Sequence, residues 1–160
     1  MKIAICDDDN SFLQNVKFLI NKIYSNPDKL SIYEYESGEQ FLLQFKPQLY
    51  DVIILDIEMC GITGLEVAEE IRKIDKSVIL AFLTSHQEVN AFRYILKNQP
   101  EHMFINQLKS IFDEYHQSHI TFPVQASNEI VNILVSDILY FEIFKRTVVL
   151  HTIKKEYQFN

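Results

Sequence analysis

Polar side chains that are capable of metal and phosphate chemistry follow several short apolar runs of this sequence. Three aspartates come after the first run, another aspartate ends a later run, and a threonine and a lysine end two more: Asp7, Asp8, Asp9, Asp56, Thr84 and Lys97. Carboxylates held close together repel one another unless a proton or a hard cation lies between them. Mg²⁺ prefers oxygen ligands, and it is the cation that this set favours.

The same residues indicate a specific reaction. With Asp7, Asp8 and Asp56 as ligands, Mg²⁺ would screen an incoming phosphoryl group. Asp56 could then attack it as a nucleophile and form an acyl phosphate. Lys97 could offset the charge of the phosphate, and the Thr84 hydroxyl could donate a hydrogen bond to it. The remaining carboxylate of the set, at position 9, is expected at a helix start, where the helix dipole favours it, and is assigned no metal.

These residues can meet only if parallel strands of one sheet end at the same edge. Short apolar segments predict strands at residues 3–5, 52–55, 78–83 and 94–97, and alternation of β-type with polar residues predicts a strand at 30–36. Between and after them, apolar residues recur at helical spacing, as in Leu13, Val16 and Ile20. This alternation predicts an α/β fold with a doubly wound, five-stranded parallel sheet, whose carboxyl strand ends converge on one crevice.

The segment between the fourth and fifth predicted strands is short. Nine residues, Ser85 to Arg93, separate Thr84 from Tyr94. A crossover between parallel strands ordinarily takes at least about 10–12 residues. We therefore expect a shortened fourth crossover without a full-length helix.

The pattern changes toward the C-terminus. Residues 130–135, 138–144 and 147–152 are rich in β-branched and aromatic side chains, and helical periodicity disappears. We predict a first domain at residues 1–117, a linker at 118–129 that contains Pro123, and an incomplete β domain at 130–160. This partial β unit is too short to bury both faces of a sheet by itself.

Composition and charge exclude several classes of protein. Hydrophobic residues make up 48% and charged residues 23% of the chain, as in globular proteins. Residues 1–118 carry 18 acidic and 11 basic side chains, whereas residues 119–160 carry four of each, so neither part attracts nucleic acid by charge. No apolar run approaches the roughly 20 residues of a membrane helix, and no signal-peptide pattern opens the chain. We expect a cytoplasmic protein without membrane association.

Four motifs, in this order, resemble those of response-regulator receiver domains of two-component phosphorelay systems: Cys6-Asp7-Asp8, Leu55-Asp56-Ile57-Glu58-Met59, Leu83-Thr84 and Tyr94-Ile95-Leu96-Lys97. The resemblance covers residues 1–117 and implies a flavodoxin-like (CheY-like) fold in which Asp56 accepts a phosphoryl group from a sensor histidine kinase. It implies that the Asp7 and Asp8 side chains and the Glu58 backbone carbonyl hold Mg²⁺. It also implies that Tyr94 turns inward when Thr84 moves toward the phosphate; a half-buried strand tyrosine is the alternative.

Residues 136–142 and 148–152 resemble the opening strands of LytTR DNA-binding domains, which often follow receivers in transcription regulators. The resemblance covers residues 124–160 and ends before such a domain would be complete. It implies a phosphoprotein that controls transcription, and receivers often pair as homodimers. We expect DNA binding only through a complete LytTR domain, which this chain lacks.

Two positions depart from the receiver pattern. Cys60 stands where the family usually has proline, and Asn98 stands where a proline usually follows the lysine, so each loop loses a fixed φ angle. Together with the short crossover, these departures leave a second function open. The chain would then keep the receiver fold without switching, as a module that binds or titrates a partner.

Enzyme functions are disfavoured. A phosphatase with an aspartyl nucleophile usually needs a second aspartate two residues on, where this chain has Glu58. The three glycines form no GxGxxG motif for a dinucleotide, and the histidines and cysteines show no metal spacing. We expect a phosphoacceptor and not an enzyme, with at most Mg²⁺-dependent self-phosphorylation and self-dephosphorylation.

Overall fold

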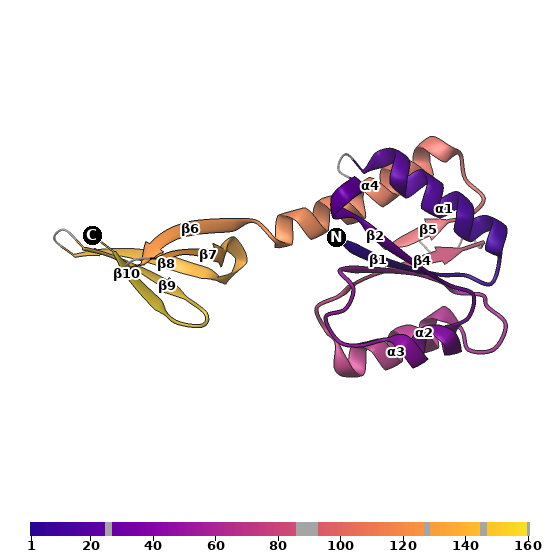
Figure 1. Ribbon diagram of the computed structural model, residues 1–160, viewed down its shortest axis with the longest axis horizontal. Helices are drawn as coiled ribbons and strands as arrows, with labels where there is room; N and C mark the ends of the chain where they lie inside the picture. The colour runs from indigo at the N-terminus through magenta and orange to yellow at the C-terminus, as the bar shows by residue number, and fades with distance from the viewer. Residues whose placement is uncertain (25–26, 86–92, 127–128, 145–146, 160) are drawn as a thin grey trace. The chain divides into compact units, whose positions relative to one another are not determined.

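The computed structural model describes residues 1–24, 27–85, 93–126, 129–144 and 147–159, which form two compact units (Figure 1). The first unit comprises residues 1–112 and the second residues 113–160. None of the helices in these described ranges is long and apolar enough to cross a membrane.

The first unit is built on a five-stranded sheet with the order β2-β1-β3-β4-β5. All neighbouring strands are parallel. The strands are β1 (Lys2–Cys6), β2 (Ser31–Tyr35), β3 (Val52–Asp56), β4 (Ile79–Thr84) and β5 (Tyr94–Leu96). The predicted doubly wound, CheY-like sheet is confirmed. The shortened fourth crossover lies largely outside the described residues, because residues 86–92 are not among them, and its conformation stays a prediction.

Helices cover both faces of this sheet, and a 3₁₀ turn, η1 (Pro27–Lys29), precedes β2. The helices are α1 (Asn10–Ile23), α2 (Gly38–Gln44), α3 (Gly64–Ile74) and α4 (Glu101–Ser118). Figure 1 shows α1 and α4 on one face and α2 and α3 on the other. Side-chain caps begin three of them: Asp9 accepts from Phe12 N, Ser37 accepts from Gln40 N, and Thr63 forms a capping box. The expected helix-start position of Asp9 is thereby confirmed.

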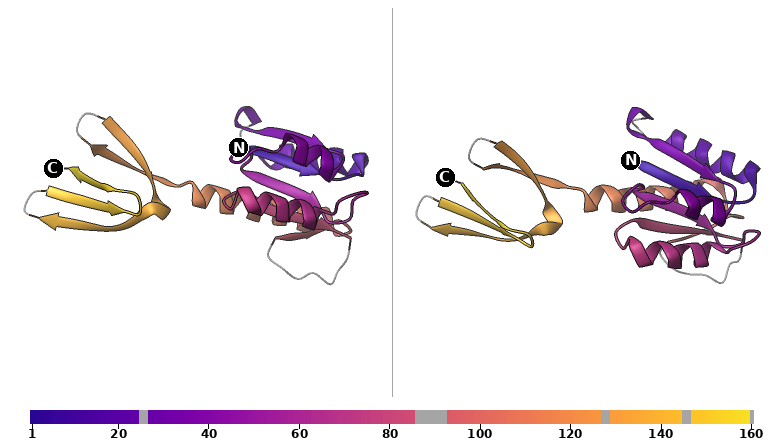
Figure 2. Two further views of the ribbon diagram at one scale, coloured as in Figure 1. Left: turned by 90° about the horizontal axis from the view of Figure 1, so that it is seen from below. Right: turned by 60° about the horizontal axis from the view of Figure 1, so that its bottom comes forward.

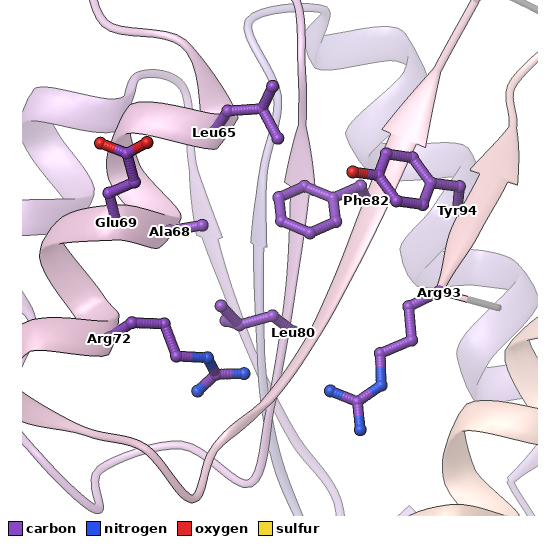
Figure 3. Close-up of a pocket in the computed structure, with 8 residues that line it drawn as sticks. All are labelled: Leu65, Ala68, Glu69, Arg72, Leu80, Phe82, Arg93 and Tyr94. Carbon is purple, nitrogen blue, oxygen red and sulfur yellow. The ribbon is translucent and has the colours of Figure 1, made fainter. Parts of the chain in front are cut away.

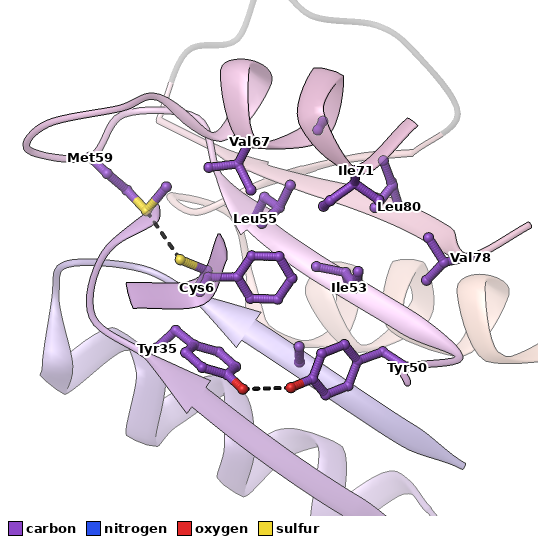
Figure 4. Packing of buried hydrophobic residues seen from close by; sticks show 13 residues of the cluster. Cys6, Tyr35, Tyr50, Ile53, Leu55, Met59, Val67, Ile71, Val78 and Leu80 are labelled. Carbon is purple, nitrogen blue, oxygen red and sulfur yellow. Dashed lines mark hydrogen bonds between the residues drawn. The ribbon is translucent and has the colours of Figure 1, made fainter. Parts of the chain in front are cut away.

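The core between the sheet and α2 and α3 is closely packed around β3, all of whose residues are buried (Figure 4). Phe41 from α2 is fully buried and packs edge-on against Tyr35 of β2. The hydroxyls of Tyr35 and Tyr50 share a hydrogen bond, so these buried polar atoms have partners. The Cys6 thiol lies 3.5 Å from the Met59 sulfur at the end of β1. Burial on both faces explains why β3 is an uninterrupted apolar run.

The second unit contains two antiparallel sheets (Figure 2). The hairpin β6 (Thr121–Ala126) and β7 (Glu129–Leu134) is drawn in orange. A 3₁₀ turn, η2 (Val135–Asp137), leads to a sheet of β8 (Ile138–Phe144), β9 (Thr147–Thr152) and β10 (Glu156–Phe159) in the order β10-β9-β8. Its small core contains Val124, Ile133 and Leu150.

The segment predicted as a linker, residues 118–129, is not an extended connection. α4 continues through Ser118, and β6 occupies Thr121–Ala126. Among the described strands β6 pairs only with β7, so its outer edge needs no N–H donor and can accommodate Pro123. The division into domains at 117 and 130 stays a prediction.

Candidate functional site

The acidic residues of the sequence meet at the carboxyl edge of the first unit's sheet. Asp7 follows β1 and Asp56 ends β3, whereas Asp8 lies at the start of the loop that leads to α1. One carboxylate oxygen from each lies within 4.8 Å of the others. Asp7 and Asp56 are buried, with 0% and 2% of their surface exposed, and Asp8 is exposed. The cluster therefore has a closed floor and an open rim.

Lys97 enters this cluster from the end of β5. Its Nζ lies 2.6 Å from Asp7 Oδ2 and 2.8 Å from Asp56 Oδ2. The ammonium also lies 4.7 Å from the centre of the Phe12 ring, at a distance where the ring attracts the cation. The Lys97 backbone N–H donates to the Thr84 carbonyl at 2.8 Å, which extends the β4–β5 pairing as far as the site. A cation thus bridges the two buried carboxylates.

Burial and charge shift the protonation of these groups in a coupled way. Burial raises the pKa of both Asp7 and Asp56, although the Lys97 ammonium works in the opposite direction. Burial would also lower the pKa of Lys97, but its hydrogen bonds to Asp56 and Asp7 outweigh burial, so its pKa is raised. Burial thus disfavours the charged forms of both carboxylates, and a cation bound between them would stabilise those charged forms.

Backbone groups hold the rim of the cluster. Asp7 Oδ1 accepts from the Asp9 N–H at 2.9 Å, and Asp8 Oδ2 accepts from the Cys60 N–H at 2.8 Å. The Cys60 N–H lowers the pKa of Asp8, which keeps this carboxylate charged. Cys60 itself is exposed. The loop after Asp56 therefore positions the carboxylate of Asp8, a residue that lies just after β1.

The loop after β3 is held close to the sheet. Gly64 begins α3 so near to Asp56 that a Cβ there would lie 2.0 Å from the Asp56 carbonyl oxygen. The Ile57 N–H donates to the Leu83 carbonyl at 3.0 Å, continuing the β3–β4 pairing beyond Asp56. The Glu58 backbone N–H donates to the Asp56 carboxylate and works against its raised pKa. The backbone around Asp56 is therefore held in place, and the Glu58 N–H orients its carboxylate.

The chemistry of the donor set fits Mg²⁺. Three carboxylates offer hard oxygen ligands within reach of one ion, and the exposed Asp8 leaves a side on which water or phosphate oxygens could complete the coordination. Asp7 Oδ2 is buried, and among the described residues the Lys97 ammonium, 2.6 Å away, provides its positive charge. A ligand role for the Glu58 carbonyl stays a prediction.

The predicted switch residues occupy the expected strands. Thr84 ends β4 and is buried, with 3% of its surface exposed. Tyr94 opens β5, is half-buried, and its ring stacks on Phe82 with a centroid distance of 5.1 Å. This is the position of a half-buried strand tyrosine, and the switching motion of Thr84 and Tyr94 stays a prediction.

Two contributors were not identified from the sequence as parts of the site. Phe12 belongs to the apolar stripe of α1, and its contact with Lys97 joins residues far apart in the chain. The Cys60 N–H acts through the backbone, which no residue type reveals. The motif spacing therefore locates the ionisable groups but not the groups that orient them.

Comparison with known proteins agrees with this geometry. Residues 3–111 match the response regulator receiver domain family. Among solved structures, the response regulatory domain of protein mrkE from Klebsiella pneumoniae is 27% identical with a TM-score of 0.59, and covers 73% of this chain and 99% of that one. Response regulator TrrA from Thermotoga maritima, solved in complex with Mg²⁺-BeF, is 29% identical with a TM-score of 0.56, and covers 69% and 97%.

Curated relatives extend the match beyond the receiver. Sensory transduction protein LytT of Oceanobacillus iheyensis is 32% identical over 111 residues, which are 64% of this chain and 44% of that protein. Sensory transduction protein LytR of Staphylococcus epidermidis is 25% identical over an alignment that covers 99% of this chain and 73% of that protein. The chain thus belongs to the response regulator receiver family, and its C-terminal region aligns with regulators of the LytR and LytT type.

Proposed function

We propose that this chain is a response regulator whose Asp56 accepts a phosphoryl group from the histidine of a sensor kinase in a Mg²⁺-dependent reaction. The observation that carries the proposal is the cluster in which Lys97 Nζ contacts Asp7 and Asp56 while oxygens of all three aspartates lie within 4.8 Å. The match to TrrA, whose structure contains Mg²⁺-BeF, supports Mg²⁺ as the ion.

The chain's own residues account for the transfer step. An Asp56 carboxylate oxygen would form a bond to phosphorus as the bond from phosphorus to the donor nitrogen breaks, and the histidine ring leaves. Asp7, Asp8 and Asp56 would hold Mg²⁺, which supplies positive charge to the phosphoryl oxygens. Lys97, already 2.8 Å from Asp56, would form an ion pair with the transferred group. The buried Thr84 hydroxyl would donate a hydrogen bond to it.

The chain acts in this proposal as a phosphoacceptor and not as an enzyme. Its partner is a sensor histidine kinase, because the receiver offers an acceptor carboxylate and no donor. We propose that the C-terminal unit belongs to the output side and serves transcription control, by analogy with the LytR and LytT proteins that it aligns with. Its β-rich part, residues 119–160, carries equal numbers of acidic and basic side chains, so the DNA affinity of this part alone is expected to be weak.

A receiver fold that does not switch is the second candidate. Only nine residues join Thr84 to Tyr94, so the strands that carry both predicted switch residues have an unusually short connection. Such a module would bind Mg²⁺ at its aspartates without passing a change on to Tyr94. It would then act by binding or titrating a partner.

Phosphorylation by a small donor tests the first proposal without knowledge of the kinase. The full chain is incubated with acetyl phosphate and either Mg²⁺ or EDTA, and intact mass spectrometry counts the added phosphoryl groups. We expect one group with Mg²⁺ and none with EDTA. Asp56→Asn should abolish the addition, whereas Asp9→Asn should preserve it because asparagine is an equally good helix cap. Equal labelling of Asp56→Asn would show that Asp56 is not the acceptor.

Amide NMR shifts with Mg²⁺ and the phosphate mimic beryllofluoride separate the two candidates. Shifts that spread from Asp56 to Tyr94 and α4 would support a working switch. Shifts confined to the three aspartates would support the module that binds without switching.

A further inference from the structure

The loop between β3 and α3, residues 57–63, contacts the start of α2 through Ile62. The Ile62 side chain packs so closely on Gly38, the first residue of α2, that a Cβ at Gly38 would lie 2.6 Å from Ile62 Cγ1. The Ile62 backbone N–H donates to Glu39 Oε1 at 3.0 Å. The first turn of α2 therefore holds the second half of this loop.

Gly61 allows the loop to approach Glu39. Its φ angle of 87° lies in the left-handed region, which favours glycine. A Cβ at this position would collide with the Glu39 carboxylate. The backbone N–H groups of Glu39 itself and of Ile62 hold the pKa of the Glu39 carboxyl below its usual range, so the acceptor stays charged. The loop can thus lie against Glu39 only because position 61 carries no side chain.

The same short segment, residues 60–62, also reaches the acidic cluster. The Cys60 N–H donates to Asp8 Oδ2 at 2.8 Å, two positions before the residue that donates to Glu39. Asp8 is exposed, so without this bond its carboxylate would be free to sample several rotamers. The segment therefore connects Glu39 on α2 to one of the three clustered carboxylates.

We propose that Glu39 is a positioning residue for the Mg²⁺ site, because it holds residues 60–62 where the Cys60 N–H orients Asp8. The proposal rests on the Mg²⁺-dependent function proposed above. With Asp8 Oδ2 bound to an N–H group, the other carboxylate oxygen is available to the ion. Groups that orient a metal ligand contribute about 10–100-fold to metal affinity, and Glu39, which acts through a further residue, should contribute about fivefold.

The test is a titration of the ¹⁵N-labelled full chain with Mg²⁺ alone, in which amide shifts in the acidic cluster give the dissociation constant. Glu39→Ala should raise this constant about fivefold. Glu39→Gln should raise it by less than about twofold, because the glutamine amide oxygen still accepts from the Ile62 N–H. The control is Glu69→Ala, which removes an exposed carboxylate from α3 (Figure 3) and should also change it by less than about twofold.

Two substitutions of Cys60 test the connection between Glu39 and Asp8. Cys60→Pro removes the backbone donor, whereas Cys60→Ala keeps it, and both lose the thiol. Mg²⁺ should therefore bind about tenfold more weakly to the proline variant than to the alanine variant. If Glu39 acts through this N–H, Glu39→Ala should cause no further loss in the Cys60→Pro chain, since independent effects would multiply.

Hydrogen exchange in EDTA supplies a readout without metal. The amides of Cys60 and Ile62 should exchange faster in Glu39→Ala than in wild type, because the middle of the loop loses its bond to α2. The Ile57 amide, which donates to the Leu83 carbonyl at the start of the loop, should keep its protection. Equal exchange of Cys60 and Ile62 in both proteins would contradict the proposed role of Glu39.

Other outcomes would also overturn the proposal. An unchanged Mg²⁺ affinity of Glu39→Ala, while wild type binds Mg²⁺, would refute the role of Glu39 and leave the phosphorylation proposal intact. Equal losses in Glu39→Ala, Glu39→Gln and Glu69→Ala would show that only charge matters. Tighter binding by Glu39→Ala would show that the Cys60 N–H competes with the ion for Asp8. Absence of Mg²⁺ binding by wild type would refute both proposals.

Discussion

Replacement of Lys97 by methionine should destabilise the first unit by about 3–4 kcal/mol at pH 7 when no divalent cation is bound. The Lys97 ammonium contacts two carboxylates whose side chains are 0% and 3% exposed. Removal of one partner from a buried ion pair costs about 3–5 kcal/mol. The cost has an upper limit, because one of the two aspartates can take up a proton instead of staying charged. Protonating a carboxylate of ordinary pKa 3.8 at pH 7 costs about 4 kcal/mol. Methionine keeps most of the apolar stem, so the loss reports the charge.

The assay is urea unfolding of the full chain, followed by the helical circular dichroism signal that arises mainly from the first unit. The gap between wild type and Lys97→Met should be largest in EDTA and should shrink in saturating Mg²⁺, because the metal then offsets the repulsion between Asp7 and Asp56. The pKa values of both aspartates are raised in the fold. Stability is therefore lost as pH rises from the ordinary carboxyl pKa through the raised values, and lowering the pH to about 5 should narrow the gap.

Lys109→Met serves as the control, since Lys109 is exposed on α4 and should change stability by less than about 0.5 kcal/mol. The reasoning is refuted if Lys97→Met unfolds at the wild-type urea concentration in EDTA. It is also refuted if the gap between the two proteins is the same with and without Mg²⁺.

Three further changes test the supports of the fold and site. Asp75→Ala should cost about 2–4 kcal/mol in urea unfolding and Asp75→Asn less, because the buried carboxylate accepts from Gln48 N, Ser77 N and Oγ, and Val78 N. Burial would raise the pKa of Asp75, but these hydrogen bonds outweigh burial, so the pKa is lowered. The stabilisation of the fold by the Asp75 carboxylate is therefore fully present above pH 3.8 and should be lost as pH falls through the lowered pKa. Gly64→Ala should cost about 1–3 kcal/mol and slow phosphorylation by acetyl phosphate, since the new Cβ would displace the Asp56 carbonyl; a wild-type rate would contradict this contact. Tyr50→Phe should lower the free energy of unfolding by about 1–2 kcal/mol, because the buried Tyr35 hydroxyl loses its partner; an unchanged urea midpoint would show that this bond contributes nothing.

The sheet and the positions of its acidic residues could be predicted because both follow from local patterns. Apolar runs flanked by polar side chains mark strands that are buried on both faces, and β3 was predicted to within one residue. Since parallel strands share a carboxyl edge, the ends of β1, β3, β4 and β5 had to lie near one another. Their side chains could therefore be placed in one site before any distance was known.

Features that depend on pairing between distant segments could not be predicted in this way. The segment around Pro123 was predicted as a linker, but it forms β6, which pairs with β7 along one edge and tolerates a proline on the other. The bond from Cys60 N to Asp8 and the position of Phe12 beneath Lys97 depend on loop geometry and on packing between elements.

The contrast between the two cysteines makes the unmodified chain suitable for chemical labelling. Cys6 is fully buried beside Met59, and burial and the charge of Asp7 raise the pKa of its thiol to about 12, so it is inert while β1 is in place. Cys60 is exposed in the loop that holds Asp8, and although its hydrogen bond to the Asp8 carboxylate raises the pKa of its thiol, reagents can reach it and a more alkaline buffer would speed its reaction. A thiol-reactive dye would thus attach at one position next to the acidic cluster, and the delayed modification of Cys6 would time the opening of the sheet.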